Sequence, residues 1–214
     1  MIVDGTDVEQ QTDRVRRPAG ARAEAREQAI LDAALELVKE VGYDRLSMDA
    51  LAERAHAGKA TIYRRWTGKA QVVAEAIRRR KSELQLDPDT GSLRDDLLAA
   101  LGRTCVSLAL DEAIVTGVMS AMRTDPELAE LMRTQVIDGG GKFDGIVARA
   151  VARGELPPGT VAQPIDEVVP ALVMMRLVFQ GQPLDEAFTV HLVDDVILPL
   201  LVRDVPYRTP TAAT

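Results

Sequence analysis

The chain has 214 residues, of which 46% are hydrophobic and only 3% aromatic, and its formal net charge is −7. A core made of Leu, Val, Ala, Ile and Met favours packed helices over a β-sandwich. The sequence has no uninterrupted run of about 18 apolar residues, so we expect no membrane span. The polar segment 1–20 lacks the apolar stretch of a secretory signal. The single cysteine, Cys105, excludes an intrachain disulfide and fits a cytoplasmic protein.

Charge is distributed unevenly along the chain. The stretch from Arg54 to Arg80 holds eight basic residues and one acid, whereas the stretch from Lys81 to the end holds 11 basic residues and 20 acids. A basic N-terminal part beside an acidic C-terminal part indicates two functions, one of them nucleic-acid binding. Charge alone leaves open the alternative that the basic residues only cover solvated faces.

The first segment, residues 1–22, has no apolar periodicity and is interrupted by Gly5, Pro18 and Gly20, which predicts a disordered arm. Its basic residues are Arg14, Arg16, Arg17 and Arg22. The sequence leaves two interpretations open. The arm either lies along a DNA groove or is a solvated tail.

Residues 23–81 predict a small helical domain. Apolar residues at spacings of three and four indicate a helix over 23–41, which Gly42 caps. Ser47 is a good N-cap for a short helix over 48–55, and a second short helix follows over 59–66. A longer helix starts at Lys69 and ends in basic residues. Two short helices joined by a tight glycine-containing turn and packed on longer ones form a helix-turn-helix.

The rest of the chain predicts a larger helical domain over 87–205, followed by a tail over 206–214. Residues 87–91 form a linker and residues 155–164 a loop rich in proline and glycine. Asp125-Pro126 is a strong helix start. The expected helices cover residues 92–109, 112–123, 126–137, 143–153, 165–181 and 184–202. The fold class is therefore all-α, with a three-helix helix-turn-helix domain before a larger helical domain.

The segment from Leu46 to Lys69, LSMDALAERAHAGKATIYRRWTGK, resembles the DNA-binding domain of the TetR family of bacterial regulators. The similarity extends over about residues 26–77. Two positions depart from the family pattern, because Gly58 and Gly68 stand where the family often has Ser. Each departure weakens a helix cap by only a few tenths of a kcal/mol, and neither removes a hydrogen-bond donor.

The resemblance implies DNA-binding roles at specific positions. Thr61 and Tyr63 contact phosphates or base edges, and Ser47 and Met48 touch the backbone from the preceding helix. Lys69 holds a phosphate with its side chain and the N–H groups beside it. The full set of expected DNA-binding residues is Ser47, Met48, Lys59, Thr61, Tyr63, Arg64, Arg65 and Lys69. Ile62 and Trp66 occupy the apolar face of the same helix, so we predict that they anchor it rather than contact DNA.

The resemblance also implies a homodimer, with residues 165–181 and 184–202 of two copies forming a four-helix interface. Such a dimer is expected to repress transcription from a palindromic double-stranded DNA operator until a small-molecule effector binds the C-terminal domain. Candidate effector-binding residues are Met119, Met122, Met174, Met175, Arg176 and Phe179. The alternative for the apolar ones is ordinary core packing. Arg176 interrupts a very apolar helix, so it either faces solvent or needs an acidic or ligand partner.

Other functions find little support in the sequence. His56 and His191 lack the spacing of a metal site, and no nucleophile with a neighbouring base is recognisable, so we expect no metal, no cofactor and no enzyme. The glycines at 139–141 lack the frame and the following Ser or Thr of a phosphate-binding loop. A protein-interaction module that only shares the fold remains the alternative to a DNA-binding regulator.

Overall fold

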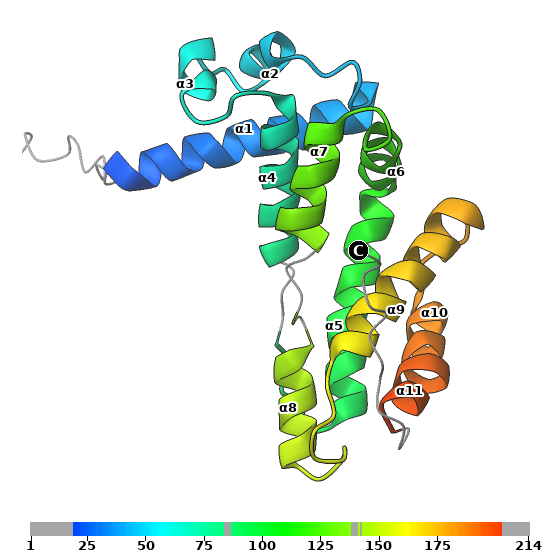
Figure 1. The fold of residues 1–214 in the computed structure, drawn as a ribbon. Coiled ribbons are helices and arrows are strands. Elements are labelled where there is room, and N and C mark those ends of the chain that lie inside the picture. The colour runs from blue at the N-terminus through cyan, green and yellow to red at the C-terminus, as the bar shows by residue number, and fades with distance from the viewer. Residues whose placement is uncertain (1–18, 84–86, 138–140, 142, 203–214) are drawn as a thin grey trace, which may run out of the picture.

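The computed structural model describes residues 19–83, 87–137, 141 and 143–202, and every regular element in these ranges is a helix. The all-α prediction is confirmed. In Figure 1 the first helix, α1 (Ala19–Val41), lies across one end of the molecule, with α2 (Met48–Arg54) and α3 (Lys59–Tyr63) on its outer side. Longer helices extend away from α1 on its other side. Within the described ranges, none of the helices combines the length and apolarity needed to cross a bilayer.

Helix α1 begins four residues before its predicted start. Residues 19–22, expected in the disordered arm, are helical because the alanines that follow Pro18 are strong helix formers. Residues 1–18, with Arg14, Arg16 and Arg17, lie outside the described part. At the other end Gly42 adopts a φ of +82° and its N–H donates to the carbonyl of Val38. This left-handed glycine confirms the predicted end of the helix.

The helix-turn-helix follows the prediction closely at its start. The Ser47 hydroxyl accepts a hydrogen bond of 3.1 Å from the backbone N–H of Ala50 and so caps α2. Helix α3 is shorter than predicted and ends at Tyr63, because the N–H groups of Arg65 and Trp66 both donate to the carbonyl of Ile62 in a tight turn. Helix α4 (Lys69–Glu83) then packs against α1, crosses it and extends away from it (Figure 1).

The helices of the C-terminal half lie where the sequence predicts them, with shifts of a few residues at their ends. Ser92, Asp125 and Asp185 each cap a helix with the side chain. Three of the predicted helices continue as π-helical segments, labelled η1 to η3. The elements are α5 (Leu93–Leu110), α6 (Glu112–Ala121), α7 (Pro126–Leu131), η1 (Met132–Ile137), α8 (Asp144–Ala152), α9 (Gln163–Met174), η2 (Met175–Phe179), α10 (Glu186–His191), η3 (Leu192–Ile197) and α11 (Leu198–Val202).

In the described part of the chain two apolar clusters form the core, and they do not divide at the predicted linker. The first cluster joins α1–α4 to Ile114, Val118, Leu128 and neighbouring residues of α6, α7 and η1. The second joins α5 to α8–α11. Helices α6 and α7 therefore pack with the DNA-binding half, although they follow α5 in the chain. The boundaries at 81 and 87 describe the chain but not the packing, and the domain limits stay predictions.

Candidate nucleic-acid interface

Helix α3 presents one apolar and one polar face. Ile62 and Trp66 are buried, as predicted, and hold the helix against the first apolar cluster. Tyr63 lies off this face and is 50% exposed, so its ring does not merely fill the core. Thr61 is half-buried, and Lys59, Arg64 and Arg65 are exposed. The outer face of α3 therefore offers hydrogen-bond donors of the kind that contact phosphates and base edges.

The turn before α3 is held in a strained but well-defined form. His56 has a φ of +48°, in the left-handed region that a residue with a Cβ rarely adopts. The N–H groups of His56 and Ala57 donate to the carbonyls of Glu53 and Ala52 at 3.1 and 2.9 Å, so the carbonyls at the end of α2 are satisfied. This closure sets the angle at which α3 leaves α2.

The three basic side chains around α3 have different surroundings. Lys59 forms an exposed ion pair of 2.7 Å with Asp49 of α2. Arg65 forms a 2.7 Å ion pair with Glu27 of α1 and lies 5.6 Å above the centre of a Trp66 ring. Arg64 pairs with none of the described residues. Its guanidinium is therefore the most available of the three for a nucleic acid.

The side chain of Lys69 has a different environment from the one predicted. Its ammonium donates to the carbonyl oxygens of Tyr43 and Asp44, at 3.0 and 3.1 Å, and lies 4.4 Å from the centre of the Tyr43 ring. Two of its three N–H groups are thereby used within the protein. In this conformation Lys69 ties α4 to the segment before α2, and the expectation that it holds a phosphate stays a prediction.

Met48 also differs from the expected pattern, because it is half-buried and packs against the first apolar cluster, whereas Ser47 is exposed. Among the expected DNA contacts, the structure therefore brings Ser47, Lys59, Thr61 and Tyr63 together with both arginines at the outer end of the molecule. Met48 and Lys69 lie behind them as supports.

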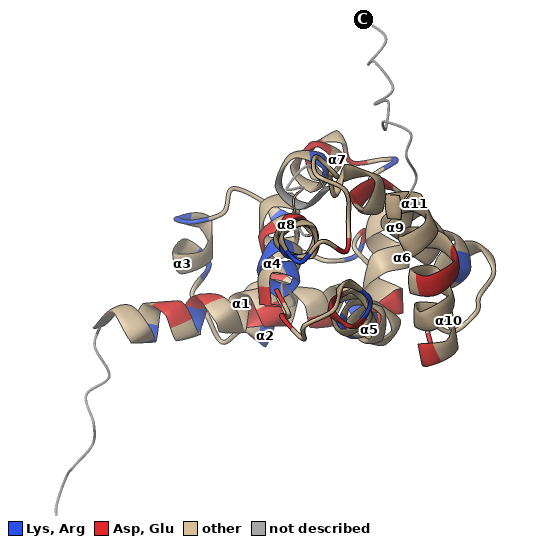
Figure 2. Ribbon diagram, turned by 90° about the horizontal axis from the view of Figure 1, so that it is seen from below, with Lys and Arg blue, Asp and Glu red and all other residues tan. Residues whose placement is uncertain are grey.

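Basic residues gather again at the C-terminal end of α4, where Figure 2 shows blue ribbon. Arg80 forms a 2.6 Å ion pair with Asp111, at the junction of α5 and α6. Arg79 donates to Gln28 of α1 at 3.1 Å and lies 3.6 Å from Glu27. At least two arginines at the basic end of α4 therefore join this helix to other helices.

The predicted effector residues do not surround one cavity. Met122 packs against the first apolar cluster, whereas Met174 packs against the second, and Met119, Met175 and Phe179 are exposed. Helical periodicity placed them on apolar faces but could not show that these faces point in different directions. Arg176 donates to the carbonyl of Pro183 at 2.7 Å and lies 4.6 Å from the centre of the Phe188 ring. Its partners are therefore within the protein.

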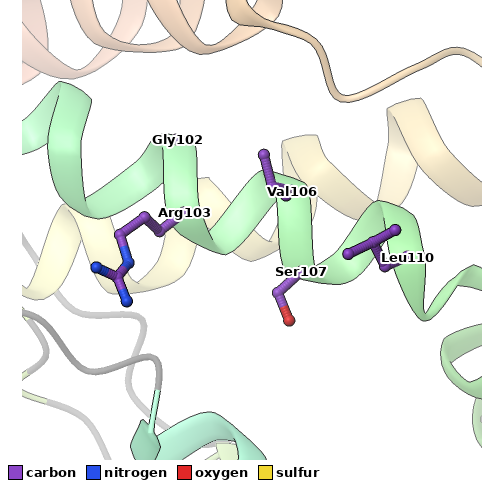
Figure 3. Close-up of a pocket in the computed structure, with 5 residues that line it drawn as sticks. All are labelled: Gly102, Arg103, Val106, Ser107 and Leu110. Carbon is purple, nitrogen blue, oxygen red and sulfur yellow. The ribbon is translucent and has the colours of Figure 1, made fainter.

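An open groove runs instead along α5. It is lined by Gly102, Arg103, Val106, Ser107 and Leu110, none of which was predicted as a site residue. Figure 3 shows the side chains of Arg103 and Ser107 on the same side of the helix. A signal was present in the sequence, because Gly102, Val106 and Leu110 follow one another at intervals of four. They form a second apolar stripe beside the buried one.

An exposed recognition helix, anchored from behind and surrounded by donors, defines a DNA-binding regulator of the helix-turn-helix class. Comparison with known proteins extends this assignment. Residues 30–76 match the profile described as "Bacterial regulatory proteins, tetR family". Residues 87–196 match that of "Tetracyclin repressor-like, C-terminal domain".

Individual relatives agree with the two profiles. The chain is 40% identical to the DNA-binding transcriptional repressor TetR of Mycobacteroides abscessus, over 85% of this chain and 96% of the relative. The crystal structure of the TetR family transcription regulator SCO0332 has a similar fold, with a TM-score of 0.65 over 83% of this chain and 97% of that one. The two sequences are 25% identical. SmeT, the repressor of a multidrug efflux pump of Stenotrophomonas maltophilia, has the same fold, with 20% identity and a TM-score of 0.58 over 88% of this chain and 99% of that one.

The chain belongs to the TetR family. It is a DNA-binding transcriptional regulator, and its relatives are regulators rather than enzymes.

Proposed function

We propose that the protein is a homodimeric repressor that binds a palindromic operator and leaves it when a small molecule binds the C-terminal half. The observation that carries the proposal is the outer face of α3, where Tyr63 is 50% exposed and Arg64 has no partner among the described residues. A polar, solvated helix face with donors at its surface suits the major groove of DNA.

Contacts to DNA require only small rearrangements of this face. Thr61 and Tyr63 bind base edges or phosphates, and Arg64 supplies the strongest free donor. Lys59 and Arg65 exchange their surface ion pairs with carboxylates for phosphates. Surface ion pairs contribute about 0–1 kcal/mol, so the exchange costs little. Ser47 contacts the backbone from the start of α2, while Met48 and Lys69 hold α2 and α4 in position.

The proposed dimer forms through α9 with η2 and through α10–α11, the elements expected over residues 165–181 and 184–202. Phe179 is 74% exposed and Met175 is exposed four residues earlier, so an apolar strip lies open on this side. Covering it with a second copy removes the strip from water. The two α3 helices then enter successive major grooves about 34–36 Å apart.

The effector is proposed to bind in the groove along α5. Leu110, at one end of this groove, accepts a hydrogen bond of 3.3 Å from Lys39 of α1 through its carbonyl oxygen. The next residue, Asp111, holds Arg80 of α4. A ligand that displaces this end of α5 therefore acts on both helices that carry the helix-turn-helix. Thermodynamic linkage requires that operator DNA weaken effector binding by the same factor. We also propose that the protein is located in the cytoplasm, because that is where bacterial operator DNA lies.

The test is footprinting of the full-length protein on the DNA beside its own gene, followed by affinity measurements on the protected duplex. Arg64→Ala is expected to weaken binding by about 1–3 kcal/mol, and Arg65→Ala by less, because Arg65 is already paired with Glu27. The affinity of the unchanged protein should fall steeply with salt, since several phosphates are neutralised.

Absence of any protected site at low salt contradicts the proposal. So does undiminished DNA affinity when Tyr63 and Arg64 are both replaced by Ala, a result that favours a protein-interaction module.

A further inference from the structure

The N-terminal part of α1 projects beyond the rest of the molecule. In Figure 1 this end of the helix extends past α3 and α4 without a neighbouring helix. Arg22 and Arg26 are exposed there, and neither forms an ion pair with a described residue. The sequence from Arg14 to Arg26 contains five arginines and a single acid, Glu24. An exposed helix end with unpaired arginines adds nothing to the core, and its like charges repel each other. The fold alone therefore does not explain why these arginines are present.

The side of α1 on which these arginines lie follows from the helix repeat. Arg22 and Glu40 are 18 residues apart, which corresponds to five turns of 3.6 residues, and Arg26 lies one turn after Arg22. Glu40 and Glu36 bind Arg54 of α2, at 2.6 and 3.5 Å. Arg22 and Arg26 therefore lie close to the side of α1 that carries the helix-turn-helix.

Their place along the helix is fixed by Glu27. This residue pairs with Arg65, two residues after the end of α3, at 2.7 Å. Arg26 precedes Glu27 directly, and Arg22 lies about 6 Å further along the axis, given a rise of about 1.5 Å per residue. The acid at 27 is neutralised by Arg65 and Arg79, so it does not cancel the two free arginines. The cationic side chains of Arg22 and Arg26 are thus placed near the C-terminal end of the recognition helix α3.

We propose that Arg22 and Arg26 form a second DNA contact, which binds phosphates of the backbone next to the half-site read by α3. This inference rests on the proposed function, because it needs an operator bound by α3. It assigns the N-terminal end of α1, a described part of the chain, to DNA. Phosphate contacts of this kind add affinity and fix the orientation of the protein but carry no sequence information.

The experiment uses full-length proteins and a duplex that holds the footprinted operator with about one helical turn of flanking DNA on each side. The variants are R22Q/R26Q, R22K/R26K and the control R94Q/R133Q. The control removes two exposed arginines from α5 and η1, each of which has a surface carboxylate partner. Gln and Lys are both good helix formers, so α1 should persist, and circular dichroism verifies this. Dissociation constants are measured by fluorescence anisotropy over a series of salt concentrations.

For R22Q/R26Q, the slope of log K against log salt should become shallower by about 1.8 for each bound protomer, because two phosphate contacts are lost. Affinity should fall on the order of tenfold at about 0.1 M salt. R22K/R26K should keep the slope, since phosphates accept either cation. Hydroxyl-radical protection outside the half-sites should disappear with R22Q/R26Q alone.

An unchanged slope for R22Q/R26Q relative to R94Q/R133Q overturns the inference and leaves the proposed function intact. The inference is also overturned if the slope becomes shallower in R22K/R26K, since a charge contact to phosphate does not require Arg. Failure of the unchanged protein to bind the duplex overturns the proposed function itself.

Discussion

The hydroxyl of Tyr43 donates a hydrogen bond of 2.5 Å to Oδ2 of Asp125, across 82 positions of the chain. Tyr43 is buried in the segment between α1 and α2, and Asp125 caps α7 through its other oxygen, which accepts from the N–H of Leu128 at 3.0 Å. The same carboxylate therefore holds the start of α7 and the helix-turn-helix. Burial and the neighbouring Asp125 raise the pKa of the Tyr43 hydroxyl well above its ordinary value, so it remains a donor at any physiological pH.

Replacing Tyr43 by Phe removes this donor and leaves the ring in place. The free energy of unfolding should fall by about 2 kcal/mol, since the acceptor is a charged group. Urea denaturation at neutral pH measures the change. Tyr63→Phe is the matched control, because that hydroxyl is on an exposed ring, and it should alter stability by less than about 0.5 kcal/mol. Equal stability of the two variants would show that the Tyr43 bond contributes nothing.

The turn of the helix-turn-helix offers a stabilising change. His56 has a φ of +48°, and a residue without a Cβ adopts this conformation at no steric cost. His56→Gly should therefore raise the free energy of unfolding by about 1 kcal/mol, with operator affinity unchanged. His56→Ala keeps the Cβ and should give no gain. A destabilised glycine variant would mean that the imidazole makes a contribution larger than the backbone strain.

The elements that were predictable from sequence are those with local chemistry. Ser47, Gly42 and Asp125 each act on backbone groups within four residues, so their effect can be recognised without a fold. Ile62 and Trp66 were also predictable, because a one-turn spacing defines a single helix face. Resemblance to a family supplied the meaning of the helix-turn-helix, and the comparisons confirm the family.

Relations between distant helices were not predictable. Met119 and Met174 both belong to apolar stripes, but only the packing shows that Met119 is exposed and that Met174 is half-buried against the second cluster. The position of the groove on α5 depends on which of the two apolar stripes of this helix the other helices leave uncovered. The ion pairs that join Arg80 to Asp111 and Arg153 to Asp96 span 31 and 57 positions, and many other pairings of these charges fit the same sequence.

The carboxylate of Asp96 has no exposed surface and joins the linker to α8. It accepts from the N–H and hydroxyl of Thr90 at 2.6 and 2.7 Å and from Arg153 at 3.1 Å. Burial alone would raise the pKa of Asp96, but these hydrogen bonds outweigh it and hold the pKa below its ordinary value. Because the folded-state pKa is the lower one, the carboxylate stabilises the protein above a pH of about 4. This contribution is lost as the pH falls through the folded-state value.

Asp96→Asn should lower the free energy of unfolding by about 3 kcal/mol at neutral pH, because it leaves a buried network without its charge. The difference from the unchanged protein should narrow below a pH of about 4, as the native carboxylate becomes protonated. Denaturation at a series of pH values measures both effects. Glu130→Gln serves as the control, since it removes an exposed carboxylate paired with Arg133 at 3.5 Å, and its effect should stay below about 1 kcal/mol at every pH. If the difference in free energy of unfolding between Asp96→Asn and the unchanged protein stays constant on acidification, the assigned titration of Asp96 is refuted.

The oligomeric state can be tested at Phe179. This ring is 74% exposed, and Met175 lies exposed on the same segment, so an aspartate at 179 places a charge in the centre of the proposed interface. Desolvating that charge against a second copy is costly. Phe179→Asp should therefore weaken dimerisation by at least about 2 kcal/mol, the usual cost of losing a central aromatic residue from an interface. Sedimentation equilibrium measures the dimer dissociation constant.

Val106→Asp provides the comparison, because Val106 is also apolar and is 59% exposed, but lies in the α5 groove rather than on η2 or α11. We expect this variant to remain dimeric and to bind the operator normally, while effector-induced release is impaired. Monomers of Phe179→Asp should bind the operator weakly, because each presents only one recognition helix and loses the avidity of two linked half-site contacts. If Phe179→Asp stays dimeric and Val106→Asp dissociates, the interface lies on α5, and the groove there is a contact between subunits instead of an effector site.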